Sequence, residues 1–272
     1  MRESEKAGAT RSPAEVHDEF FVPALFQQWG SVVVNAAGVG PDQRVLDVAC
    51  GTGVLACAAV DRVGLGGAVV GLDPSDEMLT VARRKNATIE WRVGRAESVP
   101  FPNETFDAVV SQFGLMFFED PRAALREMMR VLRPGGRLAV AVCDSLDHSP
   151  GYTAFVELLL RLFGDRVADA FRASFVLGDP QLLLSMCADA GIFNAKVVRH
   201  EGMVRFASIQ SLVSTERACA WTLGGILDDA QFAQLQKESK QALRPFVASD
   251  GTLAFVMPAL IVTAAKACAE LG

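Results

Sequence analysis

The chain of 272 residues has few of the groups that bind metal ions or nucleic acids. It contains only three histidines, and its six cysteines form no C-x-x-C pair and have no neighbouring histidine cluster. A structural zinc site is therefore not expected. The formal net charge is −6, and the longest basic run is Arg83-Arg84-Lys85. The charge argues against a nucleic-acid partner, and the few histidines and unpaired cysteines lead us to expect no metal.

Long apolar runs are also missing. The uncharged run from Gly251 to Ala265 has about fifteen residues and contains Pro258, whereas a membrane-spanning helix needs roughly 20. Residues 1–11 are polar and lack the apolar segment of a signal peptide. The cysteines lie scattered in apolar stretches, as buried free thiols of a reducing compartment do. We expect a cytoplasmic protein without stable membrane association, as a monomer or homodimer.

From Arg44 onward, strand-like runs alternate with helical stretches of about ten residues. The strand-like runs are apolar throughout, as expected for strands that are buried on both faces. Such alternation produces right-handed crossovers and a doubly wound, parallel α/β sheet. The expected strands are residues 44–49, 67–72, 88–93, 106–111 and 137–142, and the expected helices are 54–63, 75–85 and 121–132, the last stopped by Pro134-Gly135-Gly136.

After Cys143 the rhythm changes, and long helical segments interrupt the last strands. Such segments favour a lid over the carboxyl ends of the strands, where open α/β sheets bind ligands. We divide the chain into an N-terminal helical segment (1–40), a core (41–145), and the rest of the sheet with its lid (146–272). Helices are expected over 16–37, 146–175, 180–191, 208–223 and 228–246, and strands over 194–206 and 252–264.

The strongest motif is the run VLDVACGTG at residues 45–53, a strand that enters a glycine turn. Gly51 and Gly53 allow a tight turn and a close approach of a ligand. The run also fits the G-x-G-x-x-A dinucleotide fingerprint, which alone is weak evidence. Asp47 separates the two interpretations, because its carboxylate would repel a pyrophosphate and attract an ammonium or sulfonium group. Asp73, about twenty residues after the turn, would hold ribose hydroxyls in either case.

Residues 47–53 resemble motif I of the class I S-adenosylmethionine-dependent methyltransferases. Three further segments follow in the order of that family and resemble its acidic loop (71–79), its adenine-edge loop with the start of the fourth strand (94–101 and 106–107), and the helix and turn before its fifth strand (125–136). The whole match, from about 44 to 142, resembles the type-11 subgroup, which includes the quinone-biosynthesis C-methyltransferases. The resemblance implies a seven-stranded, mostly parallel sheet with helices on both faces, an antiparallel last strand and a helical lid.

The resemblance also implies S-adenosylmethionine as cofactor and S-adenosylhomocysteine as product. It places Asp73 on the ribose hydroxyls, Met78 near the adenine, and the backbone N–H of Ala96 on adenine N1. The expected cofactor-binding residues are Asp47, Ala49, Gly51, Gly53, Asp73, Pro74, Met78, Ala96, Glu97, Ser111 and Gln112.

Two positions depart from the family pattern. Ala49 stands where a glycine is usual, and we expect its φ to be negative, where alanine is tolerated. Arg95 stands where many members carry an aspartate that binds the adenine amino group, and Glu97 could take over that role.

Other residues are candidates for the acceptor site. Histidine is the side chain best suited to act as a base near neutral pH. Of the three histidines, His148 has the best position because it follows the fifth expected strand, whereas His17 lies on the leading helix and His200 on a distant strand. Residues expected to line the acceptor pocket are Phe20, Phe21, Trp29, Phe113, Met116, Tyr152 and Trp221, although aromatic residues at helical spacing also form ordinary cores.

We therefore predict methyl transfer to a small apolar or aromatic metabolite. A sulfonium methyl group is already activated, so the protein mainly has to align the reactants, and a base is needed only where the nucleophile must lose a proton. Two alternatives remain open at this point: a non-methylating binder or cyclase on the same fold, and a NAD-dependent oxidoreductase. A macromolecular substrate is disfavoured by the acidic charge.

Overall fold

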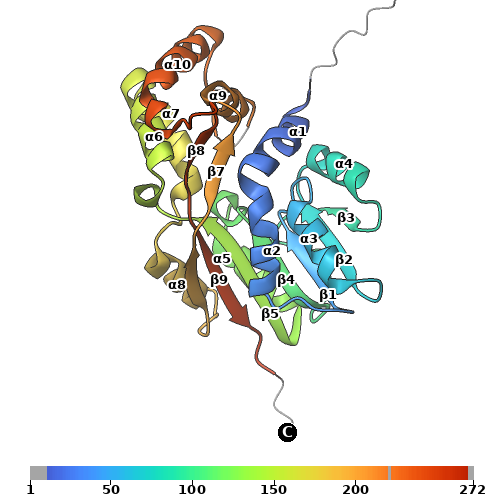
Figure 1. Cartoon of the computed structure of the whole chain (residues 1–272). Helices are drawn as coiled ribbons and strands as arrows, with labels where there is room; N and C mark the ends of the chain where they lie inside the picture. The colour runs from blue at the N-terminus through green and yellow to red at the C-terminus, as the bar shows by residue number, and fades with distance from the viewer. Residues whose placement is uncertain (1–10, 220–221, 269–272) are drawn as a thin grey trace, which may run out of the picture.

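A seven-stranded sheet forms the centre of the computed structural model, which describes residues 11–219 and 222–268 (Figure 1). The strand order is β3-β2-β1-β4-β5-β9-β6. Strands β1 to β5 pair in parallel, and β9 is antiparallel to both of its neighbours. The doubly wound sheet with an antiparallel last strand is thereby confirmed. The strands are β1 (Arg44–Val48), β2 (Ala68–Asp73), β3 (Glu90–Val93), β4 (Phe106–Gln112), β5 (Leu132–Cys143), β6 (Lys196–His200) and β9 (Ala259–Ala265).

Helices cover both faces of this sheet, and successive strand residues alternate between two buried clusters. Val45 packs in the cluster with α2 (Gln27–Ala36) and α3 (Val54–Val63). Its neighbour Leu46 packs in the other, with α5 (Pro121–Val131) and α8 (Pro180–Asp189). This two-sided burial explains why most strand runs are apolar throughout. The edge strand β3 is different, because most of its residues are exposed, so the expectation of continuous burial was wrong there.

The junction of α5 and β5 also differs from the prediction. Asp120 caps α5 by accepting a hydrogen bond from the backbone N–H of Ala123, and the helix ends at Val131. Strand β5 begins at once with Leu132 and runs through Pro134-Gly135-Gly136. The pairing shifts from Phe106–Leu132 to Ala108–Arg137 across this segment. The Pro-Gly-Gly segment is therefore an irregularity inside the strand and does not separate the helix from it.

Two predicted single strands are each divided in two. Residues 194–206 form β6 and then β7 (Met203–Phe206), and residues 252–264 form β8 (Leu253–Val256) and then β9. Strands β7 and β8 pair with each other in a separate two-stranded sheet. The breaks fall at Gly202 and at Pro258, which has no N–H to donate to a ladder. Both segments thus leave the main sheet side by side, as the β7–β8 pair, and extend into the lid (Figure 1).

The lid is helical and lies beyond the carboxyl ends of the parallel strands (Figure 1). The N-terminal segment is α1 (Pro13–Val16) followed by η1 (His17–Phe26), a π-type helix with Pro23 inside it, and it contacts both β7 and α9. No helix among the described residues is long and apolar enough to span a membrane. The lid helices are α6 (Pro150–Phe163), α7 (Asp165–Arg172), α9 (Ile209–Ala218) and α10 (Asp229–Ala242), and the remaining helices are α4 (Asp76–Lys85) and the 3₁₀ turns η2 (Leu115–Phe117), η3 (Leu146–His148), η4 (Ala173–Phe175) and η5 (Arg244–Phe246).

Candidate active site

A cavity of about 340 Å³ opens between the sheet and the lid. Its floor is formed by the carboxyl ends of four strands, which contribute Asp47 (β1), Asp73 (β2), Gln112 (β4) and Cys143 (β5). The cavity extends to Glu216 on α9, and most of its lining is apolar or aromatic. The aromatic lining residues are Phe21, Phe26, Phe113, Phe117, Phe118, Tyr152, Phe171 and Phe175, together with His17.

Asp47 is fully buried at one end of the cavity. Neither of its carboxyl oxygens has a hydrogen-bond partner among the described residues. Burial raises the pKa of Asp47 well above its usual range; the backbone N–H of Ala56 opposes this rise, and repulsion from Asp73 adds to it. A buried carboxylate without a partner is costly, so this position is suited to a cationic ligand group that would pair with it.

Asp73 organises the neighbouring loop. Its Oδ2 accepts a hydrogen bond from the backbone N–H of Gly51 at 2.9 Å, and its Oδ1 accepts one from Ser75 at 2.8 Å. The cap of α4 is Ser75, whose hydroxyl accepts from the N–H of Met78, so capping does not account for Asp73. Burial raises the pKa of Asp73, although its two N–H partners oppose that effect. Each carboxylate oxygen keeps a further lone pair for a ligand hydroxyl.

The two glycines of the turn have different roles. Both have left-handed φ values, 53° at Gly51 and 86° at Gly53. A Cβ placed on Gly51 would meet only the ring of His17 at 4.0 Å, so this glycine faces open space in the cavity. A Cβ on Gly53 would lie 2.4 Å from the Trp91 ring, and Gly53 does not line the cavity. Gly51 thus allows ligand approach, whereas Gly53 is required for packing against β3.

Ala49 contradicts the expectation of a negative φ. Its φ is 58°, in the left-handed region. The turn that leaves β1 demands this conformation, and an L-residue adopts it at a cost of about 1–2 kcal/mol. The methyl group of Ala49 also lies 2.7 Å from where a Cβ on Gly114 would stand, so the loop after β4 fits closely over it.

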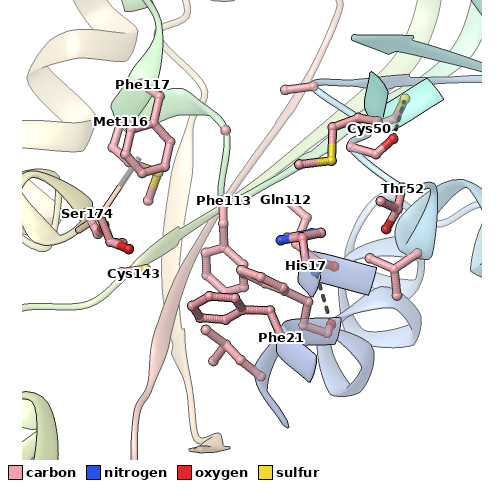
Figure 2. Close-up of a pocket in the computed structure, with 18 of the residues that line it drawn as sticks. His17, Phe21, Cys50, Thr52, Gln112, Phe113, Met116, Phe117, Cys143 and Ser174 are labelled. Carbon is pink, nitrogen blue, oxygen red and sulfur yellow. Dashed lines mark hydrogen bonds between the residues drawn. The ribbon is translucent and has the colours of Figure 1, made fainter. Parts of the chain in front are cut away.

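Residues after β4 lie in the middle of the cavity. Figure 2 shows Gln112 and Phe113 between Cys50 and Thr52 on one side and Met116, Phe117 and Ser174 on the other. The Nε2 of Gln112 donates a hydrogen bond to the carbonyl of Phe26 at 3.0 Å, which ties the strand end to η1. Phe113 has a left-handed φ of 56° and packs against Phe26 at 5.6 Å between ring centroids. The floor between the two ends of the cavity is therefore aromatic, and its contacts with Phe26 fix it to η1.

The far end of the cavity contains a polar group that the sequence did not reveal. Glu216 is 1 % exposed and lines the cavity with Tyr152 of α6 and with Thr222. Its Oε2 has no hydrogen-bond partner among the described residues. Burial raises the pKa of Glu216 to about 8, a rise that the hydroxyls of Thr222 and Tyr152 reduce in part. Phe171 and Phe175, which were expected in the lid but not named for the pocket, also line the cavity and pack against the ring of Tyr152 at 5.4 and 5.6 Å between centroids.

The predicted site residues fall into two groups. Those that line the cavity are Asp47, Ala49, Gly51, Asp73, Pro74, Met78, Gln112, Phe21, Phe113, Met116 and Tyr152. Those among the described residues that do not line it are Gly53, Ala96, Glu97, Ser111, Phe20, Trp29 and His148, and Trp221 lies outside the described residues.

The residues of the second group have other contacts. Glu97 accepts a hydrogen bond from the backbone N–H of Glu119 at 2.9 Å. Trp29 is 1 % exposed and covers Gly202, where a Cβ would lie 2.2 Å from its ring. Phe20 faces Arg11, 5.7 Å from its guanidinium carbon. Ser111 is fully buried under the loop, and its hydroxyl has no partner among the described residues.

His148 is held in a cluster of charged groups outside the cavity. Its Nδ1 lies 3.3 Å from the carboxylate of Asp144 and 3.3 Å from the guanidinium of Arg199. Asp144 is buried and also pairs with Arg199. His17 does line the cavity, but burial lowers its pKa to about 4, which makes it a weak base. We therefore assign no acid–base role to either histidine.

Comparisons with known proteins identify the family of the chain. A family model described as a methyltransferase domain matches residues 46–140. The demethylmenaquinone methyltransferase of Renibacterium salmoninarum is 43 % identical over 50 % of this chain and 56 % of its own length. The ubiquinone/menaquinone biosynthesis C-methyltransferase of Cronobacter sakazakii is 33 % identical over 69 % of this chain and 81 % of its own. The chain belongs to the class I S-adenosylmethionine-dependent methyltransferases.

The fold comparison agrees with the observed architecture. A candidate methyltransferase of Bacillus halodurans C-125 superposes with a TM-score of 0.60 at 22 % identity, covering 88 % of this chain and 98 % of that one. The sequence relatives identify the chain as a methyltransferase, and the NAD-dependent oxidoreductase is not favoured.

The site also fits the family's cofactor. S-adenosylmethionine carries an ammonium and a sulfonium group, and Asp47 is a buried carboxyl without a partner. The cofactor also carries two ribose hydroxyls, and Asp73 has acceptor capacity left at the next strand end. Gly51 leaves the space that a Cβ would fill.

Proposed function

We propose that this methyltransferase acts on an aromatic acceptor of the hydroquinone or phenol type. The observation that carries the proposal is one continuous cavity, with carboxylates at the strand ends and aromatic residues toward the lid. The related enzymes from R. salmoninarum and C. sakazakii are named for quinone substrates. A flat apolar ring would bury its surface against Phe113, Phe171 and Phe175, which favours it over a polar metabolite.

In this proposal the cofactor occupies the end of the cavity at β1 and β2. Asp47 would pair with its cationic end, Asp73 would accept hydrogen bonds from its ribose hydroxyls, and Gly51 would allow its close approach. Met78 and Pro74 would cover it from the side of α4. Ala96 and Glu97 lie outside the cavity, so they would bind the adenine edge where the cofactor extends beyond it, and Ser111 would support the loop that carries Gln112.

When bound, S-adenosylmethionine supplies a methyl group on a positively charged sulfur, which is ready for in-line displacement. The chain's own task is to align the acceptor with that methyl group and to exclude water. The loop Gln112-Phe113-Gly114 lies between the two ends, so its strained and tied backbone would fix the distance between donor and acceptor.

The test is a methyl-transfer assay with labelled cofactor. The full chain is incubated with methyl-labelled S-adenosylmethionine and a set of reduced naphthoquinones, phenols and polar metabolites, and the products are identified by mass spectrometry. We expect labelled product and S-adenosylhomocysteine only with the aromatic hydroxyl compounds. Transfer to the polar metabolites alone would contradict the proposed acceptor class. Tight cofactor binding without any S-adenosylhomocysteine would favour a non-methylating binder or cyclase.

A further inference from the structure

Glu216 is a buried carboxyl group that the cofactor end of the site does not use. It lies on α9 at the lid end of the cavity, whereas Asp47 and Asp73 lie at the strand ends. Helix α9 turns Leu212, Val213, Thr215 and Glu216 toward the interior. A buried glutamate on such a face destabilises the folded protein unless its carboxyl group has a partner, because desolvation of an unpaired carboxylate costs free energy.

The contacts of Glu216 leave part of its carboxyl group available to a ligand. The hydroxyls of Tyr152 and Thr222 interact with it, while Oε2 has no hydrogen-bond partner among the described residues. The hydroxyl of Thr222 also donates to the carbonyls of Glu216 and Cys219, which closes the end of α9. Helix α9 is thus fixed without Oε2, and that atom belongs to a group that lines the cavity.

We propose that Glu216 is the acid–base group of this enzyme, and that it takes the proton of an aromatic hydroxyl bound beside Tyr152. The proposal rests on the proposed function, since it concerns the acceptor of the same methyl transfer. It restricts the acceptor class to apolar rings with a hydroxyl group that can be ionised. An apolar ring without that hydroxyl would leave Oε2 buried and unpaired, so the site would reject it.

The proton transfer balances as follows. The O–H bond of the acceptor breaks, its proton goes to the Glu216 carboxylate, and its electron pair stays on the acceptor. If the oxygen attacks, that pair forms the bond to the methyl carbon, the sulfur–methyl bond breaks with its electron pair left on sulfur, and Glu216 releases its proton to solvent. If a ring carbon attacks, the oxygen pair becomes part of a carbon–oxygen double bond, and a ring π pair forms the bond to the methyl carbon. That ring carbon then loses its hydrogen as a proton to solvent, and Glu216 returns its own proton to the ring oxygen, which restores the hydroxyl.

The groups that face Glu216 suit this role. Titratable groups near it are Tyr152 on α6 and Cys143 on β5, and Cys219 after the end of α9 interacts with Tyr152; burial raises the pKa of Tyr152 and of Cys143. Tyr152 therefore stays protonated, and its single O–H donates to the Glu216 carboxyl, which helps to position that carboxyl in the cavity. The Glu216 pKa of about 8 places this group close to working pH, where a general base is most effective.

The first experiment measures binding and needs no turnover. The affinities of 1-naphthol and 1-methylnaphthalene for the full chain are compared by calorimetry in the parent, in Glu216→Gln and in Tyr152→Phe. We expect the parent to prefer the naphthol by about tenfold or more, the size of one hydrogen bond to a charged group. Both variants should lose most of this preference, whereas Glu157→Gln, an exposed change on α6, should keep it. An equal preference in all four proteins would overturn the proposal.

The second experiment separates a proton-transfer role from a structural one. The single-turnover rate of methyl transfer to an accepted hydroquinone is measured against pH. In the parent the rate should rise through a pKa near 8 and level off. In Glu216→Gln the rate should fall by at least about 10²-fold and lose that inflection, while the cofactor affinity stays unchanged. A variant with the parent's rate and pH profile would refute the role of Glu216 and leave the proposed function intact.

Stability measurements give a check on the variant itself. The folded-state pKa of Glu216 lies above its unfolded value of 4.5, so ionisation of this group removes stability as pH rises from about 4.5 to 8. The parent should therefore lose stability over this range relative to Glu216→Gln. If Glu216→Gln does not fold, the binding experiment is decided by Tyr152→Phe, through its affinities for 1-naphthol and 1-methylnaphthalene. Absence of any product with the parent would instead contradict the proposed function.

Discussion

Asp47 has a carboxyl group whose pKa is raised by burial, and its two oxygens have no partner among the described residues. In the ligand-free protein the carboxyl therefore holds its proton to higher pH than usual. A cationic ligand stabilises the ionised form, so binding should lower this pKa and release a proton. The affinity for S-adenosylmethionine should accordingly increase as pH rises toward the free-protein pKa.

Asp47→Asn tests this prediction. The amide keeps the size of the side chain but cannot ionise, so we expect about 10–100-fold weaker binding of S-adenosylmethionine and no proton release. Calorimetry in two buffers of different ionisation enthalpy measures both quantities. Asp61→Asn, an exposed change on α3, serves as the control and should bind like the parent. Parent-like affinity and proton release in a folded Asp47→Asn protein would exclude the ion pair.

Ala49 gives a prediction about stability. Because its φ is 58°, glycine at this position relieves backbone strain. Glycine also increases the entropy of the unfolded chain, which offsets part of the gain. We expect Ala49→Gly to raise the free energy of unfolding by up to about 1 kcal/mol, measured by urea denaturation. Ala233→Gly, in the exposed middle of α10, should instead lower it by about 1 kcal/mol. Equal losses in both proteins would show that the φ of Ala49 is not strained.

At the level of elements, the core was predictable because its signals are local. The helical stretches and the apolar strand runs of the sequence place α4, α5 and most of the sheet within a few residues. The breaks in the last strands were not predicted, since they arise from packing between distant segments. At Gly202 the chain passes directly under Trp29, about 170 residues earlier in the sequence.

Gly202→Ala tests this crossing. A Cβ there would lie 2.2 Å from the Trp29 ring and 2.8 Å from the carbonyl oxygen of Met257, so one of them must move. Overpacking of this kind costs about 1–3 kcal/mol, and we expect that loss in the free energy of unfolding. A Cβ on Gly40 meets nothing within 4 Å, and Gly40→Ala should change stability by less than about 0.5 kcal/mol. Equal effects of the two substitutions would contradict the close crossing.

At the scale of the whole molecule, the two ends of the cavity differed in how far the sequence revealed them. The cofactor end lies in one continuous motif, so Asp47, Gly51 and Asp73 could be identified together. The lid end is assembled from α6, α7 and α9, and their relative orientation is set only by tertiary packing. Glu216 had one local signal, its position four residues after the buried Leu212 on the same helix face.

The lid helices bury their apolar side chains inside the chain itself. Phe155, Leu158 and Leu159 of α6 and Phe171 of α7 are at most 2 % exposed without a second copy of the protein. Their burial favours a lid over a dimer interface as the reason for these apolar faces. Because the cavity lies beneath α6, α7 and α9, ligands at both of its ends should stabilise the closed arrangement.

Hydrogen exchange by mass spectrometry tests this last prediction. In the free protein, residues 146–175 and 208–219 should exchange faster than β1, β4 and β5, because local opening of a lid requires less free energy than opening of the sheet. S-adenosylhomocysteine together with an accepted hydroquinone should slow exchange in the lid, since bound ligands favour the closed state. The slowing should be the same at all protein concentrations, as expected for an intramolecular closure. Lid segments that are as protected as the sheet in the free protein, and that lose protection on dilution, would instead identify a contact between two copies of the chain.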